Sequence, residues 1–303
     1  MTLCRNKRIL QNKYSTWCCF DGICGKDTGR EERIMKKIVS IVIAAAMAFS
    51  LAACGSKAAA PAETTAAAAP AAEKKVITIA TSPDFPPFES LTSANEVDGI
   101  EIAVLKIICE KLGAELKIEQ MDFDSVLPGV QAGKFDIGAS GISVTEQRKK
   151  NVLFTQPYCL AAQAIVVTEG SPIKSKADLD GKKVSVQTGT TAETFCMSEG
   201  YDVSAYQANN DAQSALVSGK VDAWVIDDLT AADMVKTFNE SGNGKLVILG
   251  DAMTTEPYAF ALKFGNEELV KQIDEVLTEL LSSGKIKEIF DQYGAPYTAP
   301  QEG

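Results

Sequence analysis

The sequence predicts an α/β protein made of two similar units, each built around a mostly parallel sheet. Three observations support this fold class. Strand-like apolar runs alternate with amphipathic helices from Val76 to the end of the chain, the alternation begins again after residues 163–167, and a chain of 303 residues is long enough for about two domains. Alternation of this kind is typical of parallel strands joined by helical crossovers.

The first unit begins with a short apolar strand at residues 76–80, which ends in a turn-rich loop containing Ser82-Pro83-Asp84-Phe85-Pro86-Pro87. A helix follows, because five apolar residues recur at helical spacing and Gly113 is a natural stop: Ile102, Leu105, Ile108, Cys109 and Leu112. Further expected elements are a strand at 116–121, a helix near 125–132 and a strand at 136–139.

The second unit repeats the pattern. Strands are expected at residues 183–187, 203–207, 221–226 and 246–249, and helices near 191–197, 212–217 and 230–238. Two helices, at 267–281 and 286–293, close the chain. Ligand sites of open α/β sheets lie at the carboxyl ends of strands, so functional residues are expected in the loops that follow the strands.

A secretory leader precedes the folded part. Met35-Lys36-Lys37 is a basic start, residues 38–50 are uncharged, and Leu51-Ala52-Ala53-Cys54 resembles the bacterial lipobox, whose cysteine is lipidated after cleavage. The alternative is an ordinary signal peptide cut near Ala53. The uncharged run is too short to span a membrane. We therefore expect a signal peptide at 35–53, lipidation of Cys54, and an Ala/Pro-rich tether at 54–75.

Residues 1–34 do not fit a secretory start, and we interpret them as an upstream extension that is not part of the natural protein. Since 9 of the 30 basic and 4 of the 40 acidic residues precede Cys54, the mature chain has a net charge of −15 instead of −10. Three cysteines then remain besides Cys54: Cys109, Cys159 and Cys196. Cys109 is expected in the core, Cys159 and Cys196 could pair, and Trp224 is interpreted as a packing residue.

The composition excludes several functions. The chain has no histidine, which rules out Ser-His-Asp and Cys-His catalysis and any histidine-ligated metal. The acidic balance argues against nucleic-acid binding. We expect no cofactor and no metal.

Residues suited to an amino-acid ligand follow the expected strands. A carboxylate needs a planar bidentate donor, such as Arg148, and helix N-terminal N–H groups, such as those at Gly189-Thr190-Thr191. An ammonium needs a carboxylate, such as Asp227, and hydroxyl acceptors, while a side chain needs flat apolar walls. Ser140 and Ser143 offer hydroxyl acceptors, Phe85 and Phe123 offer apolar walls, and Gly141 allows the backbone to approach the ligand closely. Several of these residues have a simpler alternative, namely core packing for the phenylalanines, a surface ion pair for Arg148, and helix capping for Thr190 and Asp227.

Three segments make the chain resemble the polar-amino-acid substrate-binding proteins of bacterial ABC importers, solute-binding family 3. They are Ser82-Pro83-Asp84-Phe85-Pro86-Pro87-Phe88-Glu89, the run 121–148 with Phe154 and Pro157-Tyr158, and Val221-Asp222-Ala223-Trp224-Val225-Ile226-Asp227. The resemblance implies a type II periplasmic-binding-protein fold, with lobe 1 at 76–162 plus 257–303, lobe 2 at 163–256, and hinge crossings near 163–167 and 257–262.

The resemblance also implies roles. Arg148 binds the α-carboxylate, Asp227 binds the α-amino group, and Phe85 and Phe123 stack on the ligand side chain. Hydrogen-bonding neighbours are Ser140, Gly141, Ser143, Thr190 and Thr191. The implied partners are a free amino acid, an ABC permease and its ATPase, for a monomer held outside the cell by its lipid.

Two departures from the family pattern concern specificity. Gly99-Ile100-Glu101 stands where many members have Gly-Phe-Asp, and Pro83 and Asp84 crowd the first loop. Asp84 could face a basic ligand side chain or cap its turn. Two other functions remain as alternatives: a fold-related dehydratase of aromatic amino-acid synthesis, which would rely on carboxylates such as Asp84, Glu89 or Asp227, and a ligand-sensing module.

Overall fold

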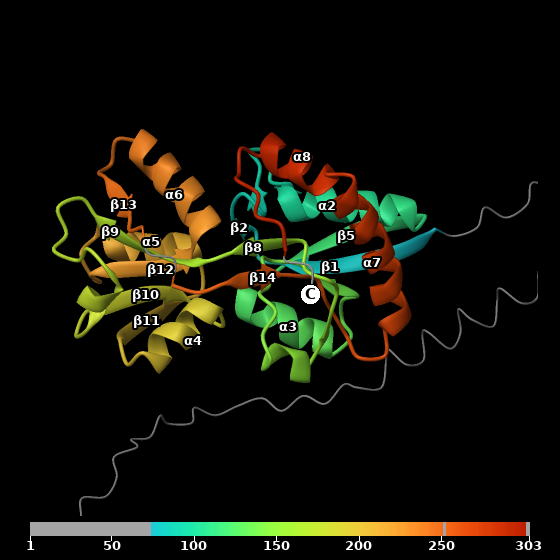
Figure 1. The fold of residues 1–303 in the computed structure, drawn as a ribbon, viewed down its shortest axis with the longest axis horizontal. Coiled ribbons are helices and arrows are strands. Elements are labelled where there is room, and N and C mark those ends of the chain that lie inside the picture. The colour runs from blue at the N-terminus through green and yellow to red at the C-terminus, as the bar shows by residue number, and fades with distance from the viewer. Residues whose placement is uncertain (1–73, 251–252, 301–303) are drawn as a thin grey trace, which may run out of the picture. The chain divides into compact units, whose positions relative to one another are not determined.

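The computed structural model describes residues 74–250 and 253–300, which form two lobes joined by two crossing strands (Figure 1). The predicted upstream extension at 1–34, the signal peptide at 35–53, the lipidation site Cys54 and nearly all of the tether lie outside the described residues. Among the residues that are described, no helix is both long and apolar enough to cross a membrane.

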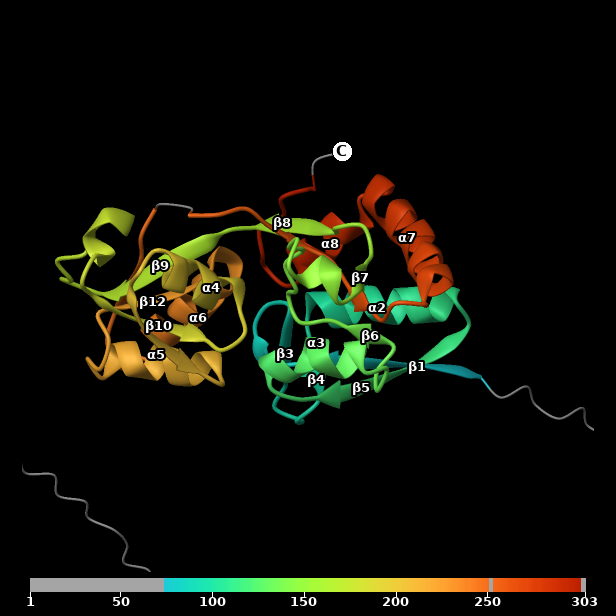
Figure 2. The same cartoon turned by 90° about the horizontal axis from the view of Figure 1, so that it is seen from below.

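The first lobe contains a five-stranded sheet with the order β5-β1-β6-β15-β7. Its strands are β1 (Lys75–Thr81), β5 (Ala114–Gln120), β6 (Ile137–Gly138), β7 (Leu153–Phe154) and β15 (Ala261–Leu262). The helices α2 (Ile100–Lys111), α7 (Glu267–Ser282) and α8 (Lys285–Gln292) lie on one side of the sheet and α3 (Phe123–Gln131) on the other (Figures 1 and 2).

The second lobe repeats this plan with the strand order β11-β10-β12-β9-β13. Its strands are β9 (Gln163–Thr168), β10 (Lys183–Gln187), β11 (Asp202–Tyr206), β12 (Ala223–Asp227) and β13 (Leu246–Ile248). Alternation along β12 sends Trp224 and Ile226 to the cluster formed with α5 (Asn209–Val217) and α6 (Asp228–Glu240). Val225 faces the opposite cluster with α4 (Thr191–Ser198). Trp224 is therefore a packing residue, as predicted.

The predicted two-lobed α/β fold is confirmed, and each sheet is mixed rather than mostly parallel. The strands β5, β1 and β6 run parallel, as do β11, β10 and β12. The other two strands of each sheet pair antiparallel: β15 with β6 and β7 in the first lobe, and β9 with β12 and β13 in the second. β15 and β9 are the strands that follow the crossings from the opposite lobe.

The first crossing lies a few residues before its predicted position, and the second overlaps its predicted position. β8 (Cys159–Ala161) and β14 (Glu256–Tyr258) pair antiparallel between the lobes (Figure 1). The predicted first hinge, residues 163–167, is strand β9 of the second sheet, and part of the predicted second hinge is β15 of the first. Sequence periodicity detects an extended run but not the sheet that the run joins.

Two smaller elements position residues of the candidate site. A three-stranded sheet of β2 (Asp84–Phe85), β3 (Glu89–Leu91) and β4 (Val97–Asp98) holds the first loop, and the 3₁₀ segment η1 (Arg148–Lys150) carries Arg148. A second 3₁₀ segment, η2 (Lys176–Leu179), lies in the second lobe.

The possible pairing of Cys159 with Cys196 is wrong, because both are buried free thiols, as is Cys109.

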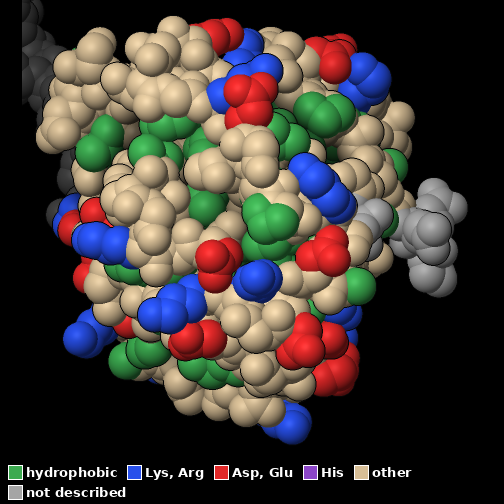
Figure 3. All heavy atoms as spheres, turned by 90° about the vertical axis from the view of Figure 1, so that its left-hand side faces the viewer, with side chains coloured by type: hydrophobic (Ala, Val, Ile, Leu, Met, Phe, Trp, Pro, Cys, Tyr) green, Lys and Arg blue, Asp and Glu red, His purple; other side chains and the backbone are tan. Residues whose placement is uncertain are grey.

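The outer end of the second lobe carries a mixture of acidic and basic side chains. Acidic and basic side chains are interspersed over this face, with hydrophobic side chains between them (Figure 3). Some form surface ion pairs, such as Lys245 with Glu169 at 2.9 Å and Lys176 with Glu199 at 3.1 Å. A mixed surface of this kind favours solubility.

Candidate ligand-binding site

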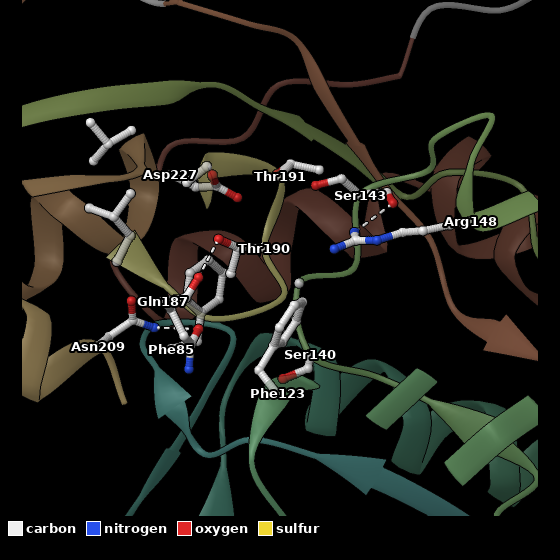
Figure 4. Close-up of a pocket in the computed structure, with 14 residues that line it drawn as sticks. Phe85, Phe123, Ser140, Ser143, Arg148, Gln187, Thr190, Thr191, Asn209 and Asp227 are labelled. Atoms are coloured by element: carbon white, nitrogen blue, oxygen red, sulfur yellow. Dashed lines mark hydrogen bonds between the residues drawn. The ribbon is translucent and has the colours of Figure 1, made fainter. Parts of the chain in front are cut away.

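A cavity with about 370 Å³ of empty volume lies between the two lobes, where the loops that follow the parallel strands meet (Figure 4). The first lobe contributes Phe85, Phe123, Ser140, Gly141, Ser143 and Arg148, and the second contributes Gln187, Thr190, Thr191, Ala192, Asn209, Val225, Ile226 and Asp227. All predicted ligand-binding residues except Asp84 line this cavity.

Arg148 is held in place by backbone carbonyls of both lobes. Its Nη1 donates to the Ser143 carbonyl oxygen at 2.9 Å, and its Nη2 donates to that of Gly189 at 3.1 Å. The guanidinium also lies 5.6 Å from the centre of the Phe123 ring. Burial lowers the pKa of Arg148, and the negative groups Glu256 and Asp227 oppose that shift. The cavity therefore holds a fixed, half-buried cation.

The N-terminus of α4 supplies donors from the opposite lobe. Thr190 caps this helix, since its Oγ1 accepts from the Glu193 N–H at 3.1 Å and donates to the Gln187 carbonyl oxygen at 2.7 Å. The capping alternative for Thr190 is thus correct as a description of its side chain. The first N–H groups of a helix have no acceptor within the helix, so those of Thr191 and Ala192 suit an anion in the cavity.

Asp227 ends β12 and is buried beside the cavity. Its Oδ1 accepts from Gln163 Nε2, and its Oδ2 accepts from the Tyr258 hydroxyl. Burial, and then the charge of Glu256, raise the pKa of Asp227 well above its usual value, while the Tyr258 hydrogen bond and Arg148 act in the opposite direction. A cation beside Asp227 would favour its ionised form.

The two aromatic walls are Phe85 and Phe123. Phe85 stacks on Phe88 with ring centroids 5.8 Å apart. Gly141 lies against this wall with φ +54°, and a Cβ at this position would be 2.5 Å from the Phe85 ring. Only glycine meets both requirements, so Gly141 fixes the distance between its loop and the aromatic wall.

Beneath this loop lie two buried glutamates, one of which holds Ser140. Glu89 Oε1 accepts from Ser140 Oγ at 2.9 Å, and Glu101 Oε1 accepts from the Tyr158 hydroxyl. Within the described part of the chain, no hydrogen-bond partner reaches Oε2 of either carboxyl group. Burial raises the pKa of both, that of Glu101 to about 7 and that of Glu89 well above its usual value. Among the described residues, no three or more His, Cys, Asp or Glu side chains are grouped to bind a metal.

The chain matches a known family over most of its folded part. The model for bacterial extracellular solute-binding proteins, family 3, matches residues 77–296. This chain belongs to that family.

Relatives of known type match most of this chain. It is 30% identical to an L-arginine-binding protein of Pseudomonas aeruginosa, over 73% of this chain and 89% of that one. It is 31% identical to a probable histidine-binding protein of Neisseria gonorrhoeae, over 86% of this chain and 96% of that one. Structures of an ancestral arginine-binding protein, bound to arginine and to glutamine, are 36% and 37% identical, cover 73% of this chain and 98% of theirs, and both give a TM-score of 0.68.

These relatives are solute-binding proteins, and this family 3 protein is likewise not an enzyme. The dehydratase alternative is therefore not supported. The cavity is lined by nine of the ten residues predicted from the motifs, and the tenth, Asp84, accepts hydrogen bonds from Gln187 and from the Asn209 N–H.

Sequence reasoning missed two residues that line the cavity, Gln187 and Asn209, and two that bond to Asp227, Gln163 and Tyr258. Gln187 ends its strand, two residues before the Gly189-Thr190-Thr191 segment that was considered, so its position at a strand end was a usable signal. Asn209 begins α5, three residues before the predicted helix start at Ala212. Nothing local marks Tyr258, whose hydroxyl reaches Asp227 from the crossing strand.

Proposed function

We propose that this protein is the extracytoplasmic binding component of an ABC importer, which captures a polar amino acid between its lobes and delivers it to a permease and ATPase. One observation carries the proposal: a single cavity is lined by a half-buried guanidinium from one lobe and by a buried carboxylate and a helix N-terminus from the other. These groups match the carboxylate and ammonium of a free amino acid.

In the proposed complex, Arg148 and the α4 N-terminus bind the α-carboxylate, and Asp227 binds the ammonium. Phe85 and Phe123 enclose the ligand side chain. The remaining neighbours are Ser140, Gly141, Ser143, Thr190 and Thr191. Since the groups come from two lobes, the ligand has a higher affinity for the closed state and shifts the population toward it.

Arginine and glutamine are the first ligands to test. The names of the relatives support arginine, and an ancestral relative has been seen with both. The lining also contains the buried amides of Gln187 and Asn209, which can donate to or accept from a polar side chain.

The test is thermal unfolding of a chain starting at Gly55, alone and with each amino acid. Arginine or glutamine should raise the midpoint, because a ligand specific to the folded state stabilises it. Arg148→Ala should remove the shift, while Lys149→Ala, at the exposed neighbouring position, should retain it. A wild-type chain that responds to no amino acid would contradict the proposal.

We also propose that the protein is a lipoprotein, with a signal peptide at 35–53, a lipid on Cys54 and a tether at 54–75. The motif Leu51-Ala52-Ala53-Cys54 supports this. A labelled fatty acid should be incorporated in cells by the natural protein and not by Cys54→Ala. Mass analysis of the unprocessed precursor should find no peptide from residues 1–34, and sedimentation should give a monomer.

We further propose domain limits of 76–162 plus 257–303 for lobe 1 and 163–256 for lobe 2. They rest on the same resemblance as the ligand site. Limited proteolysis should cleave between these ranges before it cleaves within them.

A further inference from the structure

Helix α5 of the second lobe lacks a local N-terminal cap. Its N-cap residue is Ala208, which has no side-chain acceptor, and no local side chain satisfies the helix start. The first N–H of the helix, that of Asn209, instead donates to Asp84 Oδ2 of the first lobe at 2.7 Å. The cap of α5 therefore comes from the opposite lobe.

Asp84 makes further contacts that fix its orientation and extend the link. Ser82 Oγ donates to Asp84 Oδ1 at 2.9 Å within the first lobe. Across the lobes, Gln187 Nε2 donates to Asp84 Oδ2 at 3.1 Å. Asn209 Nδ2 in turn donates to Gln187 Oε1 at 2.9 Å. The carboxylate thus joins both cavity-lining amides of the second lobe to the first loop.

We propose that Asp84 sets ligand affinity by linking the two lobes, and not by touching the ligand. The inference rests on the proposed function. In an open state the Asp84 carboxylate and the Asn209 N–H would separate and be hydrated, so their charge-assisted hydrogen bond stabilises only the closed state. Every ligand that needs closure gains from this bond equally, whatever its side chain.

The position of Asp84 supports this assignment over direct ligand contact. The cavity lining includes its partners Gln187 and Asn209 and does not include Asp84. Burial raises the pKa of Asp84, whereas its hydrogen bonds from Asn209, Ser82 and Gln187 oppose the shift. The lobes are close here, since a Cβ on Gly189 would lie 3.0 Å from Asp124 Cβ.

The chain offers a matched control. Asp124 is another first-lobe carboxylate that faces the second lobe, but its contact from Gln207 Nε2 is 3.4 Å long and exposed. Exposed contacts of this kind contribute little. Asp124→Ala should therefore change affinity by less than about threefold.

The experiment measures arginine and glutamine affinity by calorimetry for a chain starting at Gly55. Asp84→Ala should weaken both ligands by the same factor, about ten- to a hundredfold, as expected for a lost charge-assisted hydrogen bond. Asp84→Asn keeps an acceptor oxygen and should lose less. Unchanged affinity for both ligands would overturn the proposal, and so would a loss confined to arginine, which would mark Asp84 as the contact of a cationic side chain.

Amide hydrogen exchange gives a readout that does not depend on affinity. With saturating ligand, the Asn209 amide should be protected in the wild type and in Asp84→Asn, and should exchange faster in Asp84→Ala. Equal protection in all three would contradict the cross-lobe cap. If the wild type binds neither amino acid, the proposed function fails for those ligands, whereas wild-type binding that Asp84→Ala leaves unchanged overturns the Asp84 proposal alone.

Discussion

The buried pair of Glu89 and Glu101 predicts that the protein loses stability as the pH rises through neutrality. Glu101 is fully buried, and its pKa rises from 4.5 to about 7, chiefly because burial disfavours its charged form. The hydrogen bond from the Tyr158 hydroxyl reduces that shift without cancelling it. The folded protein therefore binds this proton more tightly than the unfolded chain does.

The sign and size follow from linkage. The stabilisation is fully present below about pH 4.5 and is lost as the pH rises through about 7. A shift from 4.5 to about 7 corresponds to about 3 kcal/mol. Glu89, Asp227 and Asp84 also have raised pKa values and act in the same direction, so the wild type loses more than Glu101 alone accounts for.

The substitution Glu101→Gln isolates one member of the pair. Glutamine resembles the protonated carboxyl in shape and does not ionise, so the variant should keep its stability as the pH rises. At pH 5 it should be less stable than the wild type by about 1–2 kcal/mol, since the amide cannot match every hydrogen bond. At pH 8 this deficit should shrink or reverse, because the wild type has lost its proton.

The assay is urea unfolding of a chain starting at Gly55, at pH 5, 6, 7 and 8. Glu110→Gln, an exposed position on the same helix α2, serves as the control and should leave the pH profile unchanged. If the profiles of Glu101→Gln and the wild type stay parallel, Glu101 does not titrate in this range. If the deficit of the variant grows with pH, Glu101 is a stabilising carboxylate and the reasoning is wrong.

Three further predictions concern other parts of the fold. Gly141→Ala should weaken ligand binding more than tenfold, because its Cβ meets the Phe85 ring at 2.5 Å; Gly170→Ala, also at positive φ but with open space around it, should cost only about 1 kcal/mol in unfolding experiments and leave affinity unchanged. Thr190→Ala should lower the free energy of unfolding by about 1 kcal/mol through loss of the α4 cap, and Thr190→Ser should not. Without reductant, a thiol reagent should modify three cysteines in the denatured chain starting at Gly55 and react slowly with the native one, since burial raises the pKa of each thiol; a count of one would indicate a disulfide between two of Cys109, Cys159 and Cys196.

Local pattern was sufficient for most helices and strands. The strand at 183–187 was predicted with the bounds that β10 has, and the helix predicted at 267–281 is α7, one residue longer. These elements are determined by apolar periodicity and by nearby stops, which a sequence contains directly. The first crossing was misplaced because residues 159–168 form one nearly continuous extended run, and the change from β8 to β9 depends on pairing with distant strands.

The candidate site was predictable where its residues follow strands. Arg148, Asp227 and the Thr190-Thr191 turn all occupy such positions, and their chemistry suggests the ligand. Gln163 and Tyr258 could not be found in this way, because they act on Asp227 from the crossing segments. Asp84 was chosen for its charge, but its partner is a backbone N–H in the other lobe, a donor that every residue except proline possesses.

The places where this sequence breaks local rules coincide with its long-range links. Ala208 is a poor helix cap, and Glu89 and Glu101 are unusual in a core, so each would count as a defect if only neighbouring residues were considered. In the structure, the missing cap is supplied by Asp84, 125 residues away, and Glu101 Oε1 accepts from Tyr158, 57 residues away. These residues are tolerated because distant residues supply the hydrogen bonds that their neighbours lack. Asp84 links α5 to the first lobe, and Glu89 holds the Ser140-Gly141 loop. A substitution that gives α5 a local N-cap, or one that removes the need for the distant partner of a buried glutamate, should therefore weaken the coupling between folding and ligand binding.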